Sequence, residues 1–205
     1  LLVFLERGAS EIASAYSLNE YAADINILDV AETGANGASA YKKVYPKNMD
    51  GITISSKYVL YSAKNSSGEI TDLILQNVSG DVYEYGIVTK APGSSAAGGM
   101  YSYTVDTGKA TYSVTSSANY KIYVGNAVRL IPDGNGFDSV KSLGSAISGI
   151  TSLTETSLTA SKKEYKISPD VSVFKKTGLY TYHAISLSEL VENASEYKVT
   201  AYANA

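Results

Sequence analysis

Apolar and polar positions alternate along short stretches of the chain from Tyr41 onward. Residues 52–54, 58–61, 70–78 and 82–88 follow this period of two, and Gly, Ser or Asn residues separate them. A period of two over such lengths is typical of half-buried β-strands. The same alternation returns in the second half, over residues 101–105, 110–114, 120–124 and 127–131. The pattern therefore predicts a mainly β fold, and the apolar run at residues 1–5 predicts one further strand.

Turn signals separate these predicted strands. Asn65–Gly68 and Ser79–Asp81 lie between the strands of the first series, which predicts a β-meander. Asp106–Lys109 is a hairpin signal, and Asp133–Gly136 is a further turn.

Two short helices are expected in addition. Ser17 and Glu20 have the spacing of a capping box, and Leu18, Tyr21 and Ile25 follow at helical intervals. Ser186 and Glu189 repeat the capping-box spacing near the other end of the chain. Residues 32–40, rich in Gly and Ala, are expected to form a flexible connection.

The clearest break is the stretch at 91–99, rich in Gly, Ser and Ala and without periodicity. It predicts a linker between a β-rich domain at 1–90, which includes the N-terminal helix, and a second β-rich domain at 100–205. Tyr120-Lys121-Ile122 recurs as Tyr165-Lys166-Ile167. A repeated unit and a chance echo in a Tyr-rich chain both remain open. The predicted fold is thus one of small antiparallel sheets or barrels, repeated or not, with one or two short helices.

Composition narrows the range of possible functions. The chain holds 18 Tyr, 3 Phe, no Trp and no Cys, and its formal charge is −3. Disulfides and thiolate metal sites are excluded, and nucleic-acid binding is not expected without a basic stripe. No apolar run is long enough to span a membrane, so direct membrane insertion is not expected. Because the chain opens at Leu1 without a signal peptide, we interpret it as a piece of a longer protein.

Residues with the chemistry of an active site are few. His183 is the single histidine, and no nucleophile motif accompanies it, so we expect a surface or core strand residue. Asp133–Asp138 carries oxygen ligands at short spacing, as calcium loops do, but departs from the EF-hand pattern. A plain turn is the favoured interpretation. We therefore predict no enzyme activity, no cofactor and no metal site.

Tyrosines at alternate positions are the candidate binding residues. Residues two apart on a strand face the same side, so each pair could form a platform for sugars or for a partner protein. The alternative is that the rings cover a sheet face and pack across strands. The candidates are Tyr83, Tyr85, Tyr101, Tyr103, Tyr180 and Tyr182.

The segment from Ser67 to Val88 carries a resemblance. Its pattern Ile-x-x-Leu-x-Leu-x-x-Val-x-Gly-Asp-x-Tyr-x-Tyr-Gly, from Ile70 to Gly86, resembles the β-rich region that follows S-layer homology modules in cell-surface proteins of Firmicutes. Residues 165–171 and 185–190 are similar to the same region. The resemblance implies an exported parent protein held at the cell wall, and assigns no site residues.

Together these observations predict a structural or interaction domain of a bacterial surface protein, extracellular and associated with the cell wall or S-layer. Its expected partners are other surface proteins or cell-wall glycans, in a spacer, lattice or adhesion role. The alternative is a carbohydrate-binding accessory domain of a secreted multidomain enzyme. Exposed, coplanar Tyr rings would favour this alternative, and Tyr rings packed between strands would favour the structural role.

Overall fold

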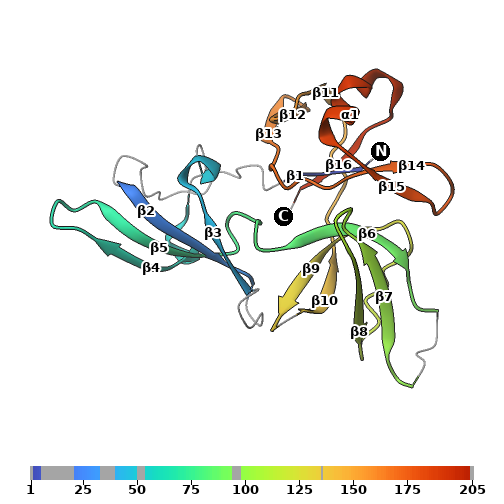
Figure 1. Cartoon of the computed structure of the whole chain (residues 1–205), viewed down its shortest axis with the longest axis horizontal. Helices are drawn as coiled ribbons and strands as arrows, with labels where there is room; N and C mark the ends of the chain where they lie inside the picture. Colours follow the sequence, from blue (N-terminus) through green and yellow to red (C-terminus); the bar gives the residue numbers. More distant parts are fainter. Residues whose placement is uncertain are drawn as a thin grey trace. The chain divides into compact units, whose positions relative to one another are not determined.

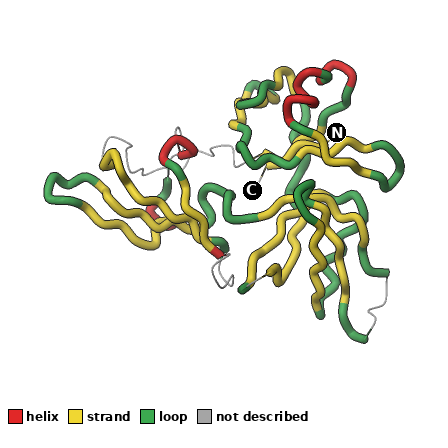
Figure 2. Tube along the Cα trace, in the orientation of Figure 1, coloured by secondary structure: helices red, strands yellow, loops and turns green. Residues whose placement is uncertain are grey.

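The computed structural model describes residues 2–5, 21–32, 40–49, 54–93, 98–134 and 136–203. The fold is mainly β, as the alternation predicts, and Figure 2 shows strands throughout. Within the described residues the sheets are open, and none closes into a barrel. No helix in these ranges is long and apolar enough to cross a membrane.

The described residues form two compact units, a small one within residues 21–82 and 132–134 and a larger one within residues 2–5, 83–131 and 136–203. This division differs from the expected one at 91–99. That stretch connects two neighbouring antiparallel strands of one sheet, and residues 94–97 within it lie outside the described residues. The change of unit falls between Val82 and Tyr83 instead.

The small unit is a four-stranded sheet in the order β3-β2-β5-β4 (Figure 1). The two central strands are parallel and each edge strand is antiparallel to its neighbour. The strands are β2 (Tyr21–Val30), β3 (Tyr41–Val44), β4 (Val59–Lys64) and β5 (Ile70–Gln76). Two 3-10 turns, η3 (Pro46–Met49) and η4 (Ser56–Tyr58), contribute Met49 and Tyr58 to the core against one face of the sheet.

The prediction of an N-terminal helix is wrong for those of its residues that the structure describes. Residues 17–20 lie outside the described residues, but Tyr21 and Ile25 belong to strand β2. Ile25 and Ile27 alternate into the core, and an isolated capping-box spacing does not outweigh that burial. The expected connection at 32–40 and the expected strand at 52–54 lie mostly outside the described residues, which leave out 33–39 and 50–53.

Of the two turns predicted in this unit, one is confirmed and the other does not join paired strands. Asn65–Gly68 is the predicted turn between β4 and β5, and the Asn65 side chain accepts hydrogen bonds from the Ser67 and Glu69 amides, both at 3.0 Å. The β-meander continuing past Ser79 is wrong, because β5 and the next strand lie in different sheets. Residues 77–83 connect the two units rather than forming a hairpin turn.

The larger unit contains a five-stranded sheet in the order β10-β9-β6-β7-β8. Its strands are β6 (Glu84–Lys90), β7 (Tyr101–Asp106), β8 (Thr111–Ser116), β9 (Ala127–Asp133) and β10 (Gly136–Ser142). The predicted hairpin at Asp106–Lys109 is confirmed between β7 and β8. Gly86 lets β6 approach β7 closely, because a β-carbon there would collide with the Asp106 carbonyl oxygen.

Two further sheets complete this unit. One has the order β15-β14-β1-β16 and the other β11-β12-β13. Their strands are β1 (Leu2–Leu5), β11 (Ile150–Leu153), β12 (Ser157–Ala160), β13 (Lys163–Lys166), β14 (Val173–Lys176), β15 (Tyr182–Ile185) and β16 (Thr200–Ala203). The strand expected at residues 1–5 is confirmed as β1, which pairs with β14 and β16 near the other end of the sequence.

The second predicted helix is confirmed as α1 (Leu187–Glu192). The Ser186 hydroxyl accepts a hydrogen bond from the Glu189 amide at 3.0 Å, as the capping-box spacing predicts. A short 3-10 turn, η5 (Ala194–Glu196), follows the helix. Leu190 is the buried residue of α1 and packs in a core with Leu158 and Val173.

The two copies of the Tyr-Lys-Ile sequence adopt different structures. Residues 120–122 are irregular, with Lys121 at φ 54°, so the strand expected at 120–124 is wrong. In the second copy, by contrast, Tyr165 and Lys166 end strand β13. The echo in sequence is therefore not a structural repeat at these residues.

Candidate functional site

The six candidate tyrosines take up different environments. Tyr83 is 5% exposed and Tyr103 is fully buried, so the expectation that these two are surface residues is wrong. Tyr85, Tyr101 and Tyr182 are half-buried. The exposed member is Tyr180, at 64%. Alternate spacing placed each pair on one face but could not show which face of the sheet would be covered.

Tyr103 is buried because it faces the core of the five-stranded sheet, beside Val105 and Val128. Its hydroxyl accepts a hydrogen bond from the Tyr120 amide at 2.9 Å and donates one to Asn119 Oδ1 at 3.2 Å. The Tyr103 and Tyr120 ring centroids lie 5.6 Å apart. This phenol satisfies an irregular segment of backbone, which is a packing role.

Three more of the candidates, Tyr83, Tyr85 and Tyr182, also pack within the larger unit. Tyr83 contacts Tyr85 edge to face, with centroids 6.4 Å apart, and the Arg129 guanidinium lies 4.6 Å from the Tyr83 ring centroid. Tyr85 and Tyr182, nearly a hundred residues apart in sequence, both pack on the buried cluster around Phe174. Gly125 makes room for Tyr182, because a β-carbon there would lie 2.5 Å from the Tyr182 hydroxyl.

The two other candidate groups are surface features. His183 is exposed on β15, an edge strand, opposite Lys175 of β14, so its expected place on a surface strand is confirmed. Asp133 ends β9 and Gly136 begins β10, so this segment is the turn between two adjacent strands; Asn135 lies outside the described residues. Within the described ranges, no three carboxylate or imidazole groups gather as metal ligands would.

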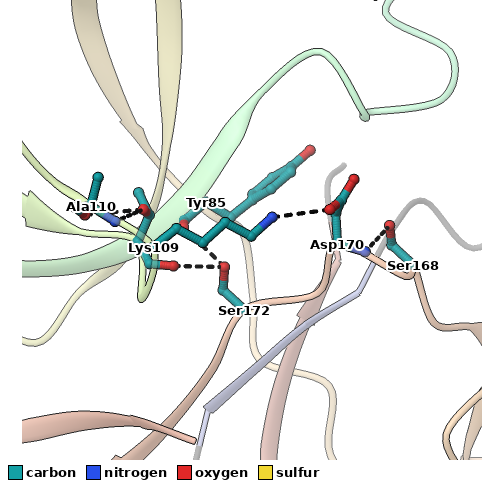
Figure 3. A network of polar contacts seen from close by, with 7 residues as sticks. Tyr85, Lys109, Ala110, Ser168, Asp170 and Ser172 are labelled. Carbon is teal, nitrogen blue, oxygen red and sulfur yellow. Dashed lines mark hydrogen bonds and ion pairs between the residues drawn. The ribbon is translucent and has the colours of Figure 1, made fainter. Parts of the chain in front are cut away.

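A polar junction fastens the five-stranded sheet to the segment before β14 (Figure 3). The Ser172 hydroxyl lies 3.0 Å from the Thr107 carbonyl oxygen and 3.3 Å from that of Tyr85, and it donates its single proton to either. The Lys109 ammonium pairs with Asp170 at 3.0 Å, with both side chains more than half exposed. A serine in an irregular stretch gives no sequence signal for this junction.

A buried carboxylate organises the small unit. Asp29 of β2 is fully buried, and each of its oxygens accepts from the Val78 amide at 3.1 Å. One oxygen also accepts from the amide and the hydroxyl of Ser79, both at 2.6 Å. Asp29 thereby holds the chain where it leaves β5, just after Asn77 turns with φ 53°. The signal in the sequence is a single acidic residue at a core-facing position of an alternating strand.

One groove of about 500 Å³ lies beside the edge strand β11. It is lined by residues 149–153, 194–195 and 197–199, among which Thr151, Ser152, Ser195 and Tyr197 carry hydroxyl groups. The Tyr197 hydroxyl accepts a hydrogen bond from the Lys175 ammonium at 2.9 Å. That hydrogen bond is the largest cause of the raised pKa of Lys175.

Within the described residues, the chain forms several small open sheets, and most of the candidate tyrosines pack inside the larger unit. Comparison of the chain with protein-family models, curated proteins and solved structures found no match in any of the three.

Proposed function

We propose that this chain is a non-catalytic structural or interaction domain of a bacterial cell-surface protein, of the S-layer-like kind, acting as a spacer, lattice component or adhesive face. Its parent protein is exported, and its partners are other surface proteins. The resemblance from Ser67 to Val88 supports the location. The packing of the tyrosines supports the structural role.

The observation that carries the structural role is the buried tyrosine network of the five-stranded sheet. Tyr103 uses its hydroxyl on Asn119 and Tyr120, inside the unit, where no ligand reaches it. Across the same unit, Ser172 ties two sheets together, and β1 pairs with strands from the far end of the chain. A domain fastened together in this way suits the transmission of load and the spacing of other modules.

A second candidate is the carbohydrate-binding accessory domain, and the groove beside β11 favours it. Hydroxyl groups and an aromatic ring at Tyr197 are the chemistry that sugar-binding grooves use. Tyr180, exposed at the β14–β15 turn, offers another ring.

A pelleting assay separates the two candidates. The purified chain is mixed with cell-wall sacculi or with insoluble polysaccharides, with and without a calcium chelator, and the bound fraction is measured. The structural proposal predicts that the chain stays in the supernatant. Specific pelleting that Tyr197→Ala or Tyr180→Ala abolishes, while the circular dichroism spectrum is unchanged, would establish the glycan-binding function instead.

A further inference from the structure

The sheet of the small unit has two faces of unequal cover. Ile27, Leu73 and Leu75 point to the core side, where the 3-10 turns pack. The register places the alternate residues on the other side, which we call the outer face. One row crosses all four strands of this face, and it reads Lys43, Leu28, Ile74 and Tyr61 from β3 to β4.

Among the described residues, the outer face carries several apolar side chains that are partly or largely exposed. Leu28, Val30 and Ile74 are partly exposed, and Tyr61 is 53% exposed on the edge strand β4. Tyr41 is exposed on the opposite edge strand, β3. Contiguous apolar surface of this kind marks an interaction site more often than scattered single residues do.

When the same row of a second copy is laid over this one in reversed order, each side chain meets a complementary partner. A two-fold axis that runs along the strands between β2 and β5 lays Leu28 of one copy on Ile74 of the other. The same axis lays the Lys43 ammonium over the Tyr61 ring, a cation–π arrangement. The chain forms this kind of contact repeatedly, since Lys163 lies 4.9 Å from the Tyr165 ring centroid and Lys57 lies 4.7 Å from that of Tyr58.

A neighbouring row agrees with this symmetry. Asn26 on β2 and Asp72 on β5 are register partners in the outer face, and the Asn26 amide already donates to the Asp72 carboxylate within the chain at 3.2 Å. The two-fold axis brings the Asn26 amide of one copy above the Asp72 carboxylate of the other. A donor therefore meets an acceptor, and no like charges are opposed.

We propose that the outer face of the small unit binds the same face of a second copy of the chain, in a two-fold symmetric contact. Such an interface uses one patch twice, which is what the self-complementary row provides. The partner is thus a second copy rather than an unrelated protein, because an unrelated partner would not require a row that matches its own reverse.

The area of the face sets the strength of the contact. Four strands about 4.8 Å apart and about five residues long give a face of roughly 300 Å² per copy. The total of roughly 600 Å² is below the 1,200 Å² or so of a stable complex, so the contact is weak. Many weak contacts of one kind add up when copies are held in an array. This inference rests on the proposed structural role and names its partner.

Sedimentation velocity of the whole chain tests the contact. Over a concentration series up to about 1 mM, wild type is expected to shift reversibly from monomer toward dimer, as a weak interface does. Tyr61→Lys opposes two lysines across the axis and is expected to lower the association constant at least about tenfold. The double variant Lys43→Tyr with Tyr61→Lys restores a self-complementary row and is expected to regain association.

Tyr123→Lys is the matched control, since Tyr123 is likewise an exposed tyrosine but lies in the other unit, and this variant is expected to associate as wild type does. Circular dichroism verifies that each variant is folded. A wild type that remains monomeric at the highest concentration overturns the proposal, as does a folded double variant that fails to recover. Both results are independent of pelleting with cell walls, so they leave the proposed function to its own test.

Discussion

The Asp29 carboxylate offers a sharp test of how the small unit is held together. Replacing it by Ala leaves two amides and one hydroxyl without their acceptor, and both donor residues, Val78 and Ser79, are buried. An unsatisfied buried donor costs about 1–3 kcal/mol, and part of this is recovered by relaxation and by no longer burying a charge. We expect Asp29→Ala to lower the free energy of unfolding of this unit by about 2–4 kcal/mol.

Two further variants give the expected order. Ser79→Ala removes one donor from the carboxylate, and also the acceptor of the Asp81 amide, so a loss of about 1–2 kcal/mol is expected. Asn at position 29 keeps an acceptor oxygen but turns an amide donor toward the Val78 amide. Asp29→Asn should therefore destabilise almost as much as Asp29→Ala. Asn26→Ala, on the outer face, is the control and should change stability little.

Urea unfolding followed by far-ultraviolet circular dichroism measures these differences. Hydrogen exchange adds a local measure, because the Ser79 amide should be strongly protected in wild type and exchange quickly in Asp29→Ala. The reasoning fails if Asp29→Ala unfolds at the wild-type midpoint and the Ser79 amide keeps its protection. It also fails if Asp29→Asn is as stable as wild type, since hydrogen-bond geometry would then not require the carboxylate.

Three other predictions concern the larger unit. In urea unfolding, Ser172→Ala should lower the free energy of unfolding by about 1 kcal/mol. Lys109→Ala, which breaks an exposed ion pair, should lower it by less than about 0.5 kcal/mol. The reverse order would contradict the assigned junction. Ser186→Ala removes the cap of α1 and should cost about 1 kcal/mol in the same assay, and an unchanged midpoint would rule the cap out. The pKa of Lys175 is raised above 10.5 by its hydrogen bond to Tyr197, so the ammonium stabilises the fold below that pH and loses this effect as pH rises through the folded-state pKa. Thermal midpoints of wild type and Tyr197→Phe should therefore differ by a constant amount below pH 10.5 and converge above it, and a gap that widens there would count against this assignment.

Local patterns in the sequence were sufficient to predict several of the strands and one helix. Ser186 and Glu189 are adjacent in a helical turn, so their spacing contains the whole interaction that they form. The same spacing at Ser17 and Glu20 misled, because Ile25, Ile27 and Asp29 alternate toward a core that lies elsewhere in the chain. Burial against distant residues decides between strand and helix in such a short segment.

Features that depend on distant pairing were not predictable. The pairing of β1 with β16 joins segments near the two ends of the chain, and β2 pairs in parallel with β5 although β3 and β4 lie between them in sequence. The environment of each tyrosine depends on this topology, since the sheet on which Tyr103 lies is covered on the face that it occupies. The Ser172 junction and the Asp29 clamp likewise join residues that are far apart in sequence.

Labelling of intact cells tests the central claim most directly. An antibody raised against the purified chain is applied to cells of the organism that encodes it, before and after permeabilisation, with an antibody to a cytoplasmic protein as the control for leakage. The account predicts equal labelling of intact and permeabilised cells. Labelling that requires permeabilisation would contradict a role at the cell surface.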